Sequence, residues 1–293
     1  MDIVITYVDG NDPVWKQDYE KYTNVPVMQK RFRDWGTLKY LLRGIEVNMP
    51  FIRNVYLVVS HPSQVPDWAD KGNLKIVLHR DIIPEEFLPT FNCNPIEMHL
   101  HRIPGLDEEY LYFNDDMYPV DKCVPEDFFR DGKAVIGYYR HMFASNMYKK
   151  ICRNSDILAR RIADAKPSCF FMRPQHICSP MYRAMCEEAY SKAEEEIRRT
   201  SASRTRTEEN LNQYLFLNYQ YLKGRLIPEK VSNKHISVAM TSVSGLWTAI
   251  MEPRGKMLCI NDVHLSEERY QELRTIILEA FERKFPVKSR FEK

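Results

Sequence analysis

The sequence predicts an α/β fold, arranged as an α/β/α sandwich, and two observations carry this prediction. Short runs rich in β-branched and aromatic residues alternate with longer segments whose apolar residues recur at helical spacing. Along the chain these elements follow the order β-α-β-β-α-β, which favours a sheet covered by helices. The expected strands are residues 3–8, 55–60, 74–78 and 110–113, and the expected helices between them are residues 34–50 and 94–103.

The first expected strand, Ile3–Val8, is followed directly by an acidic turn. The sequence Asp9-Gly10-Asn11-Asp12-Pro13 is made of residues that favour turns. A first strand that ends in such a loop is typical of nucleotide-binding α/β folds. The alternative for this segment is a plain β-turn with no ligand.

Basic residues precede the first expected helix. Lys30, Arg31 and Arg33 stand within four residues of each other, just before a helix start. Asp34 is a good N-cap, and the apolar residues after it recur at helical spacing until Pro50. Cations gathered near a helix start indicate an anion, and phosphate is the first candidate. A solvated basic face explains the same pattern equally well.

A capped helix is expected early in residues 88–121. Asn94 is the expected N-cap and Pro95 the expected first helical residue. Glu97, three residues after Asn94, completes a capping-box pattern. The sequence therefore predicts that this helix begins at Pro95.

The later turns of this helix carry two histidines and an arginine. His99 shares a face with apolar residues and is expected to be a core residue. His101 and Arg102 are expected on exposed faces, where they are candidates for ligand contact. A helical metal pair of His99 and His101 is not expected, because residues two apart do not face the same side of a helix.

Two adjacent carboxylates follow the next expected strand. Tyr110–Phe113 is aromatic and favours a strand, and Asn114, Asp115 and Asp116 stand at its carboxyl end. Ligands bind at the carboxyl ends of strands in open α/β sheets. Neighbouring acids repel each other unless a cation or a proton lies between them, so a divalent metal explains the pair. A solvated turn has about equal weight on this evidence alone.

The second half of the chain adds one histidine of interest. Ser179 and Pro180 have the pattern of an N-cap and a first helical residue, which puts His176 in the loop just before a helix. Loop side chains before a helix start often point into clefts, although a single loop histidine is usually structural. The other expected elements are a solvent-facing helix end and loop over 187–206, a helix over 207–222, a strand over 257–262 and a helix from Ser266.

Composition narrows the class of protein. The chain has 293 residues, of which 44% are hydrophobic and 28% are charged, as in ordinary soluble globular proteins. The net charge of +2 gives no bulk argument for binding nucleic acid. Seven cysteines without CxxC spacing favour reduced thiols over a disulfide framework. A signal peptide is not expected, because the sequence starts directly on an expected strand, with no basic n-region and apolar h-region. A transmembrane span is not expected either, because the longest uncharged run, Ile236–Met251, falls short of about 20 residues.

Four ordered blocks of the sequence carry a family pattern. They are IVITYVDGNDPVW (3–15), RFRDWGTLKYLLRGIE (31–46), LPTFNCNPIEMHLHRIPGLDEEYLYFNDDMY (88–118) and CINDVH with EAFERKFPVKSRFE (259–292). Together they resemble the Stealth family of sugar-phosphate transferases, which act in capsular and cell-wall polysaccharide synthesis. The animal enzyme that tags lysosomal glycoproteins with N-acetylglucosamine-1-phosphate is a relative of this family.

The resemblance implies a glycosyltransferase-like, Rossmann-type fold and a reaction. A hexose-1-phosphate, such as N-acetylglucosamine-1-phosphate, would pass from a UDP-sugar to a hydroxyl of an acceptor glycan, with release of UMP. The expected cofactor is Mg²⁺ or Mn²⁺. The expected partners are the UDP-sugar donor and a glycan acceptor, either free or lipid-linked, and no nucleic acid.

The resemblance also assigns residues to roles. His176 matches the histidine taken as general base, Arg206 matches a basic residue of the segment that follows, and Asp116 is expected to be catalytic and to bind metal. Relatives often carry an acid where Asn210 stands, so no role is assigned to it. The expected metal ligands are Asp115, Asp116 and Asp262, and the expected nucleotide- or donor-binding residues are Val8, Asp9, Gly10, Arg33, Arg43, Asn94, His101 and Arg102.

One domain is expected over residues 1–293, compact and with a helical insertion. It would consist of a nucleotide-binding core (1–150), a helical acceptor-side segment (151–230) and a closing strand and helix (231–293). A cytoplasmic location is expected, with at most peripheral attachment to the inner face of the membrane.

Two other functions compete with this one. The first is a metal-dependent glycosyltransferase of the same fold, which would release UDP instead of UMP. The second is a catalytically silent protein that binds sugar nucleotides or glycans. The silent protein ranks last, because it predicts loss of acids or of the histidine, and Asp115, Asp116, His176 and Asp262 are all present.

Overall fold

The fold is built around a mostly parallel sheet with the strand order β10-β4-β1-β2-β3. The structure, a computed structural model, describes residues 1–293 apart from the side chain of Gln29. Strands β1 to β4 run parallel, and β10 runs antiparallel beside β4. The predicted α/β class with a Rossmann-like sheet is therefore confirmed. The strands of this sheet are β1 (Asp2–Thr6), β2 (Val55–Val59), β3 (Leu74–Leu78), β4 (Glu109–Asn114) and β10 (Ser179–Tyr182).

The central strands are buried on both faces, which explains their continuous apolar runs. In β1, Ile3 lies opposite Val55 of β2 on one side and Leu111 of β4 on the other. All three side chains are fully buried. Parallel strands covered by helices on both faces are expected to have this composition rather than an alternating one.

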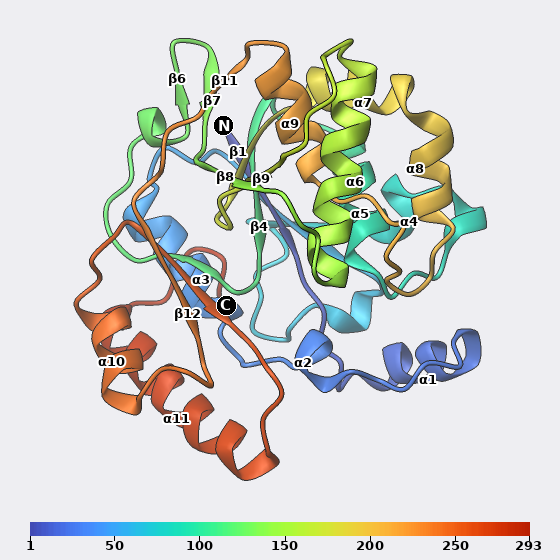
Figure 1. Cartoon of the computed structure of the whole chain (residues 1–293). Helices are drawn as coiled ribbons and strands as arrows, with labels where there is room; N and C mark the ends of the chain where they lie inside the picture. Colours follow the sequence, from blue (N-terminus) through green and yellow to red (C-terminus); the bar gives the residue numbers. More distant parts are fainter.

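Helices lie on both sides of the sheet (Figure 1). In that view α3 (Leu38–Asn48) lies on one side, near α10 (Val243–Met251) and α11 (Glu267–Lys284). On the other side α6 (Met147–Ile162) packs against α9 (Tyr214–Leu222). The remaining helices are α1 (Pro13–Tyr22), α2 (Gln29–Phe32), α4 (His79–Ile82), α5 (Cys93–His99), α7 (Arg183–Lys192) and α8 (Glu194–Ser201), with short 3₁₀ helices at Pro62–Gln64, Glu85–Phe87, Leu100–Arg102 and Pro125–Asp127.

A smaller sheet joins the last strand of the chain to the strand that follows β4. Its order is β12-β13-β5, and β5 follows β4 after a turn formed by Asp115 and Asp116. The predicted last strand therefore pairs in this sheet and lies beside the acidic pair. The strands outside the main sheet are β5 (Met117–Pro119), β6 (Phe129–Arg130), β7 (Lys133–Val135), β8 (Tyr138–His141), β9 (Phe171–Pro174), β11 (Leu226–Ile227), β12 (Asn233–Ser237) and β13 (Met257–Asn261).

The predicted start of α5 is wrong by two residues. Asn92, and not Asn94, is the N-cap, and its side-chain oxygen accepts a hydrogen bond from the Asn94 amide at 3.2 Å. Glu97 forms no capping box, because its carboxylate accepts a hydrogen bond from the Gln213 amide at 2.9 Å. Both asparagines suit an N-cap locally, and a contact with a distant segment determines the role of Glu97.

Four other predicted elements differ from the structure. The helix predicted to be capped by Asp34 begins at Leu38, with Thr37 as its N-cap. Ser179 and Pro180 begin strand β10, which pairs with β4 at the edge of the sheet, where a proline is tolerated. The helix predicted over 207–222 begins only at Tyr214. The charged stretch from 187 to 206 is largely helical, because it contains the end of α7 and all of α8.

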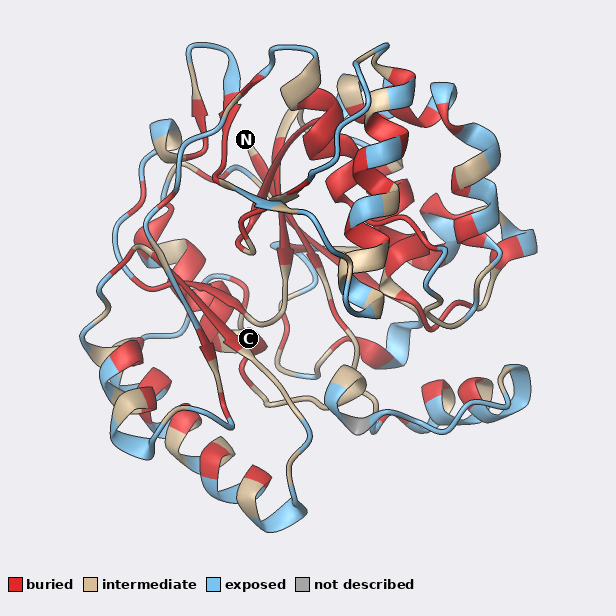
Figure 2. Cartoon of the chain, viewed as in Figure 1, coloured by how far each residue is buried: buried red, intermediate tan, exposed pale blue. Residues whose placement is uncertain are grey.

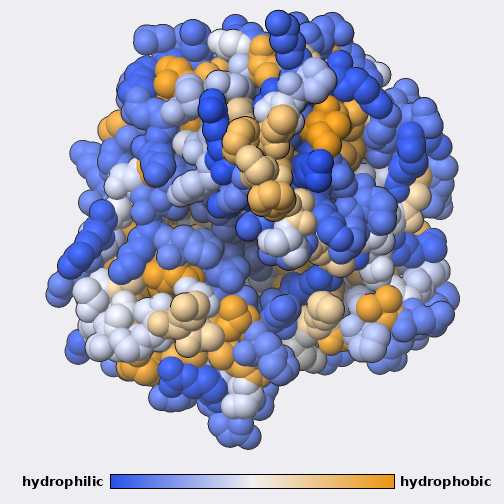
Figure 3. All heavy atoms as spheres, in the orientation of Figure 1, coloured by the Kyte–Doolittle hydropathy of each residue, from blue (hydrophilic) through white to orange (hydrophobic). Residues whose placement is uncertain are grey.

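Burial follows this layered arrangement (Figure 2). Buried residues (red) fill the sheet strands and the helix faces turned toward them, and exposed residues (pale blue) cover the outer faces. The face of the molecule seen in this orientation has a hollow near its centre (Figure 3). Hydrophilic side chains and a ridge of apolar side chains border the hollow. Among the described residues, no helix combines the length and the apolar character needed to cross a membrane.

Candidate active site

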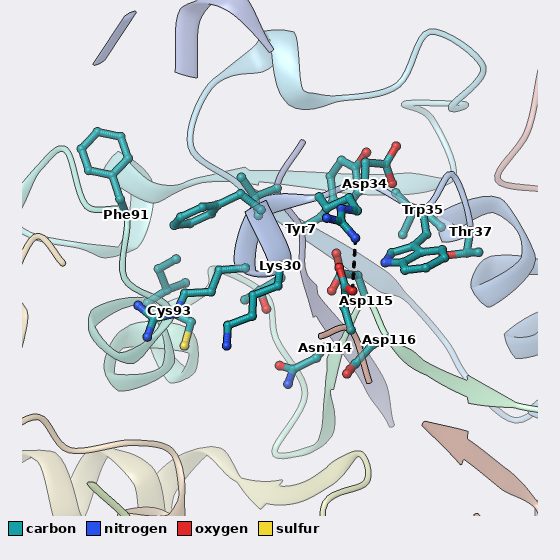
Figure 4. Close-up of a pocket in the computed structure, with 18 of the residues that line it drawn as sticks. Tyr7, Lys30, Asp34, Trp35, Thr37, Phe91, Cys93, Asn114, Asp115 and Asp116 are labelled. Atoms are coloured by element: carbon teal, nitrogen blue, oxygen red, sulfur yellow. Dashed lines mark hydrogen bonds and ion pairs between the residues drawn. The ribbon is translucent and has the colours of Figure 1, made fainter. Parts of the chain in front are cut away.

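A pocket opens at the carboxyl ends of β1 and β4. Its wall includes the end of β1, residues between Lys30 and Leu38, and the start of α5. It also includes the turn after β4, the loop residue Arg206 and the residues at the end of β13. In the close-up, Asp115 and Asp116 lie on the same side as Trp35, whereas Cys93 and Phe91 lie on the opposite side (Figure 4). This is the edge of the sheet at which the sequence predicted a ligand.

The acidic side of the pocket has carboxylate oxygens without partners. Asp116 Oδ1 and Asp262 Oδ2 are both buried and form no hydrogen bond within the described part of the chain. Burial, followed by the negative charges of Asp116 and Asp34, raises the pKa of Asp115 to about 8. Buried carboxylates that lack donors are costly unless a cation balances them. The donor set therefore fits a divalent cation that prefers oxygen ligands.

Asp262 reaches this pocket from the end of β13. Its Oδ1 lies 3.5 Å from Arg33 Nη1 and accepts a hydrogen bond from the Val263 amide at 2.6 Å. The guanidinium of Arg33 also lies 4.5 Å from the ring centre of Tyr270, in a cation–π contact. The structure thus brings the predicted residues Arg33, Asp115, Asp116 and Asp262 together.

Cations lie on other parts of the pocket wall. Arg206 Nη2 donates to Cys93 Sγ at 2.7 Å, and Arg31 Nη2 donates to Met147 Sδ at 3.9 Å. Burial, reinforced by the charge of Arg206, lowers the pKa of Arg31. Two neighbouring guanidinium groups that contact sulfur atoms instead of carboxylates provide charge for an anionic ligand. Together with the exposed Lys30, they complete a basic side of the pocket.

The loop after β1 shapes the pocket by close backbone packing. The Gly10 amide donates to the Phe32 carbonyl oxygen at 2.7 Å, and a Cβ at position 10 would collide with that oxygen. Glycine is therefore required for this approach. Asp9 accepts from the Asn11 amide at 2.8 Å, and its own amide donates to Gln64. Of the predicted residues Val8, Asp9 and Gly10, only Val8 belongs to the pocket wall.

Aromatic rings form one end of the pocket wall. Trp15 packs against Phe32 and Phe91, with ring centres 4.7 Å and 5.7 Å away. All three belong to the wall, so the pocket combines flat apolar surfaces with opposite charges on different sides. The sequence carries no local signal for this group of rings, because residues 15, 32 and 91 come together only in the folded chain.

The predicted base, His176, lies in the turn between β9 and β10. Its Nδ1 is 3.5 Å from the Tyr214 hydroxyl, and its ring centre is 5.7 Å from that of His235. His176 is not part of the pocket wall, but its neighbour Cys259 contacts Asp116, which is. The thiol of Cys259, close to His176, donates to Asp116 Oδ2 at 3.4 Å.

Arg206 is held at the pocket by an amide network. Asn210 Oδ1 accepts from Asn92 Nδ2 at 2.8 Å and from the Thr207 amide at 3.0 Å. Asn210 is buried, so its side chain ties the loop that carries Arg206 to the start of α5. This gives Asn210, which had no predicted role, a structural one.

Besides Asp9 and Gly10, four more predicted donor-binding residues lie outside the pocket wall. Arg43 is buried in ion pairs near the C-terminus, and Asn94 is buried beside Cys93 inside α5. His101 was expected to be exposed but is buried, with Nε2 3.0 Å from Glu187 Oε2. The guanidinium of Arg102 lies 4.3 Å from the ring centre of Tyr190. The helix faces predicted to be exposed are covered by residues distant in sequence.

The chain is similar in sequence to a known family and to several named proteins. Residues 31–136 match the model of the family described as Stealth protein CR2, conserved region 2. A protein named capsular polysaccharide phosphotransferase WcwK, from Streptococcus pneumoniae, is 31% identical over an alignment of 331 residues that covers 100% of this chain and 99% of that protein. The receptor polysaccharide phosphotransferase WefC of Streptococcus oralis is 30% identical, with the same coverage.

Two further likenesses are weaker. The exopolysaccharide phosphotransferase cps2G of Lactiplantibacillus plantarum is 29% identical, over 100% of this chain and 96% of its own. Among solved structures, the galactosyltransferase LgtC in complex with donor and acceptor sugar analogues is similar over 94% of this chain and 95% of that chain, with 12% identity and a TM-score of 0.42. Because two of these proteins match the whole chain at 31% and 30% identity, the chain belongs to the Stealth family of sugar-phosphate transferases.

Proposed function

We propose that the protein transfers a hexose-1-phosphate from a UDP-sugar to a hydroxyl group of an acceptor glycan and releases UMP. The observation that carries the proposal is the division of charge in the pocket, with carboxylates on one side and guanidinium groups that donate to sulfur atoms on another. A diphosphate between sugar and nucleoside requires both a cation and positively charged side chains. The names of the full-length relatives, which are polysaccharide phosphotransferases, support the same class of reaction.

Asp115, Asp116 and Asp262 would hold a Mg²⁺ or Mn²⁺ ion. The buried oxygens of Asp116 and Asp262 that have no donor among the described residues support this assignment, since hard cations prefer carboxylate oxygens. When bound, such an ion would neutralise the negative charge of the donor's phosphates. Arg33, which faces Asp262, balances the remaining charge on that carboxylate.

Arg31, Arg206 and Lys30 are the candidates for binding the donor's phosphates. Guanidinium groups bind phosphate oxygens in pairs, and such charge-assisted hydrogen bonds are among the strong ones. The ring of Phe32 and the side chain of Val8, both on the pocket wall, offer apolar surface for the nucleoside. Of the donor-binding residues expected from the sequence, we retain Val8 and Arg33.

His176 is the proposed base. The acceptor oxygen attacks the β-phosphorus, the bond from that phosphorus to the bridging oxygen of UMP breaks, and His176 takes the proton of the acceptor hydroxyl. Histidine suits this role because it exchanges protons near neutral pH. The hydroxyl of Tyr214, 3.5 Å from Nδ1, would orient the ring.

The acceptor is proposed to be a growing polysaccharide, either free or lipid-linked. Relatives named for capsular polysaccharide and exopolysaccharide support a glycan acceptor. We also propose that the protein works in the cytoplasm, with at most peripheral contact with the inner face of the membrane. A single domain with the three segments 1–150, 151–230 and 231–293 remains part of this proposal.

The identity of the released nucleotide tests the proposed reaction. The purified protein would be incubated with Mg²⁺, a panel of UDP-sugars and a mixture of glycan acceptors, and the nucleotide product identified by chromatography. We expect UMP, and we expect its release to stop when a chelator removes the metal. Release of UDP would instead support glycosyl transfer from the same donor. The variant Asp116→Asn, prepared in parallel, controls for contaminating hydrolases.

A further inference from the structure

Three potential metal ligands lie together beside the acidic pair, and the proposed reaction uses only one of them. His176, His235 and Cys259 each offer one ligand atom, and these atoms all lie within 4.8 Å of one another. They come from the turn after β9, from β12 and from β13, respectively. His235 and Cys259 are direct partners in the parallel pairing of β12 with β13, so the sheet fixes their spacing.

The chemistry of this cluster differs from that of the carboxylate site. Imidazole nitrogen and thiolate sulfur suit Zn²⁺ and Co²⁺, whereas Mg²⁺ prefers oxygen. Zinc bonds of about 2.0–2.3 Å place neighbouring ligands of a tetrahedral site roughly 3.3–3.8 Å apart. Small side-chain rotations therefore bring the three atoms from their present spacing into a shared coordination shell.

A fourth ligand stands next to the cluster. Asp116 Oδ2 lies 3.4 Å from Cys259 Sγ, which is the spacing expected for two ligands of one ion. A zinc ion on the thiol displaces the proton that Cys259 now donates to Asp116. His235 is exposed and Cys259 is buried, so the cluster has an entry path on one side and a protected sulfur on the other.

We propose that His176, His235 and Cys259 form a second metal site, selective for Zn²⁺-like ions over Mg²⁺, with Asp116 available as a fourth ligand. A metal bound there holds the lone pair of His176 that takes the acceptor proton in the proposed reaction. Zinc would therefore act as a reversible inhibitor of transfer. The inhibitory role rests on the proposed function, whereas the metal site does not.

Cobalt binding tests the site without any assay of activity. Titration of the purified, reduced protein with Co²⁺ should give a thiolate-to-cobalt charge-transfer absorption that saturates at about one equivalent. Cys259→Ser should lose this absorption, while Cys169→Ser, which alters an exposed cysteine, should keep it. No charge-transfer absorption in the wild type, or one that persists in Cys259→Ser, would overturn the proposal.

A second variant covers the case in which Cys259→Ser fails to fold. His235 is exposed, so His235→Gln leaves the core intact, and it should weaken Co²⁺ binding by at least about tenfold. Unchanged affinity in this variant would also overturn the site.

The inhibitory role is tested by UMP release in the presence of Zn²⁺. Zinc should inhibit the wild type at lower concentrations than it inhibits His235→Gln. Cobalt binding without UMP release would mean that the metal site stands and the proposed function fails. UMP release without cobalt binding would mean the reverse.

Discussion

Arg43 and Glu292 form a buried, bidentate ion pair. Nε and Nη2 of Arg43 each lie 2.8 Å from one carboxylate oxygen of Glu292, and only 5% and 4% of the two side chains are exposed. Nη1 of the same arginine donates to the Phe285 carbonyl oxygen at 2.7 Å. An arginine predicted to bind the donor's phosphates instead ties α3 to the last residues of the chain.

The first prediction is that Arg43→Met destabilises the fold. The substitution leaves the Glu292 carboxylate buried without its partner, which costs about 3–5 kcal/mol of the free energy of unfolding. Urea denaturation measures this loss. The double variant Arg43→Met/Glu292→Met should regain most of it, because it removes the unpaired charge as well. A change in the donor's KM with unaltered stability would instead return Arg43 to the donor site.

The second prediction concerns His176. If this side chain takes the acceptor's proton, His176→Ala should lower kcat by roughly 10²–10⁴-fold while UDP binding, measured by calorimetry, changes little. His61→Ala, which alters an exposed histidine that forms the cap of a short 3₁₀ helix, is the matched control and should keep wild-type turnover. Near-normal turnover of His176→Ala would remove His176 as the base.

Local patterns predicted the sheet well. The apolar runs at 3–8 and 55–60 correspond to β1 and β2, because strands buried on both faces require such continuous runs. The run at 74–78 corresponds to β3, which lies at the edge of the sheet and is only partly buried. The burial of the 3₁₀ helix Leu100–Arg102, which follows α5, depends instead on distant residues. His101 packs against rings of Tyr190 and Phe216, which lie on α7 and α9, so a face that looks exposed on an isolated helix is covered.

In the candidate site, too, some residues could be predicted from the local sequence and others could not. The position of Asp115 and Asp116 after a strand was readable locally, because the carboxyl end of a parallel strand is where ligands bind. The contact of Arg206 with Cys93 joins residues 113 positions apart and has no local signal. Ser179 has the local pattern of an N-cap, yet it pairs with Tyr112 in the main sheet.

The third prediction is that Asp116→Asn weakens metal-dependent donor binding. The amide keeps the shape of the side chain but removes the charge that would hold the cation. Binding of a UDP-sugar, followed during a Mg²⁺ titration, should require at least about tenfold more metal. Asp121→Asn, which alters an exposed acid five residues further along the chain, is the control and should bind like the wild type. An unchanged metal requirement in Asp116→Asn would count against the ligand assignment.

The fourth prediction is a dependence of stability on pH that originates from Glu97. Burial, opposed by the hydrogen bond from the Gln213 amide and the charge of Arg206, raises the pKa of Glu97 from 4.5 to about 7. Between these two pH values the folded protein keeps a proton that the unfolded chain has lost. The contribution of Glu97 is therefore fully present below pH 4.5 and is lost as the pH rises through about 7, by about 3 kcal/mol in total.

Comparison of the wild type with Glu97→Gln separates the contribution of Glu97 to the free energy of unfolding from the contributions of the other titrating groups. Glutamine keeps an oxygen that accepts the hydrogen bond from Gln213 but has no proton to lose, so the variant should become more stable relative to the wild type as the pH rises from 4.5 to 7. Urea denaturation at a series of pH values gives the difference directly. Glu195→Gln, which alters a glutamate on the exposed side of α8, should follow the wild type throughout. The difference in the free energy of unfolding between the wild type and Glu97→Gln could instead stay constant across this pH range. That result would mean that the Glu97 carboxyl ionises in the folded protein as it does in the unfolded chain. Arg206 would then already be paired with a negative charge.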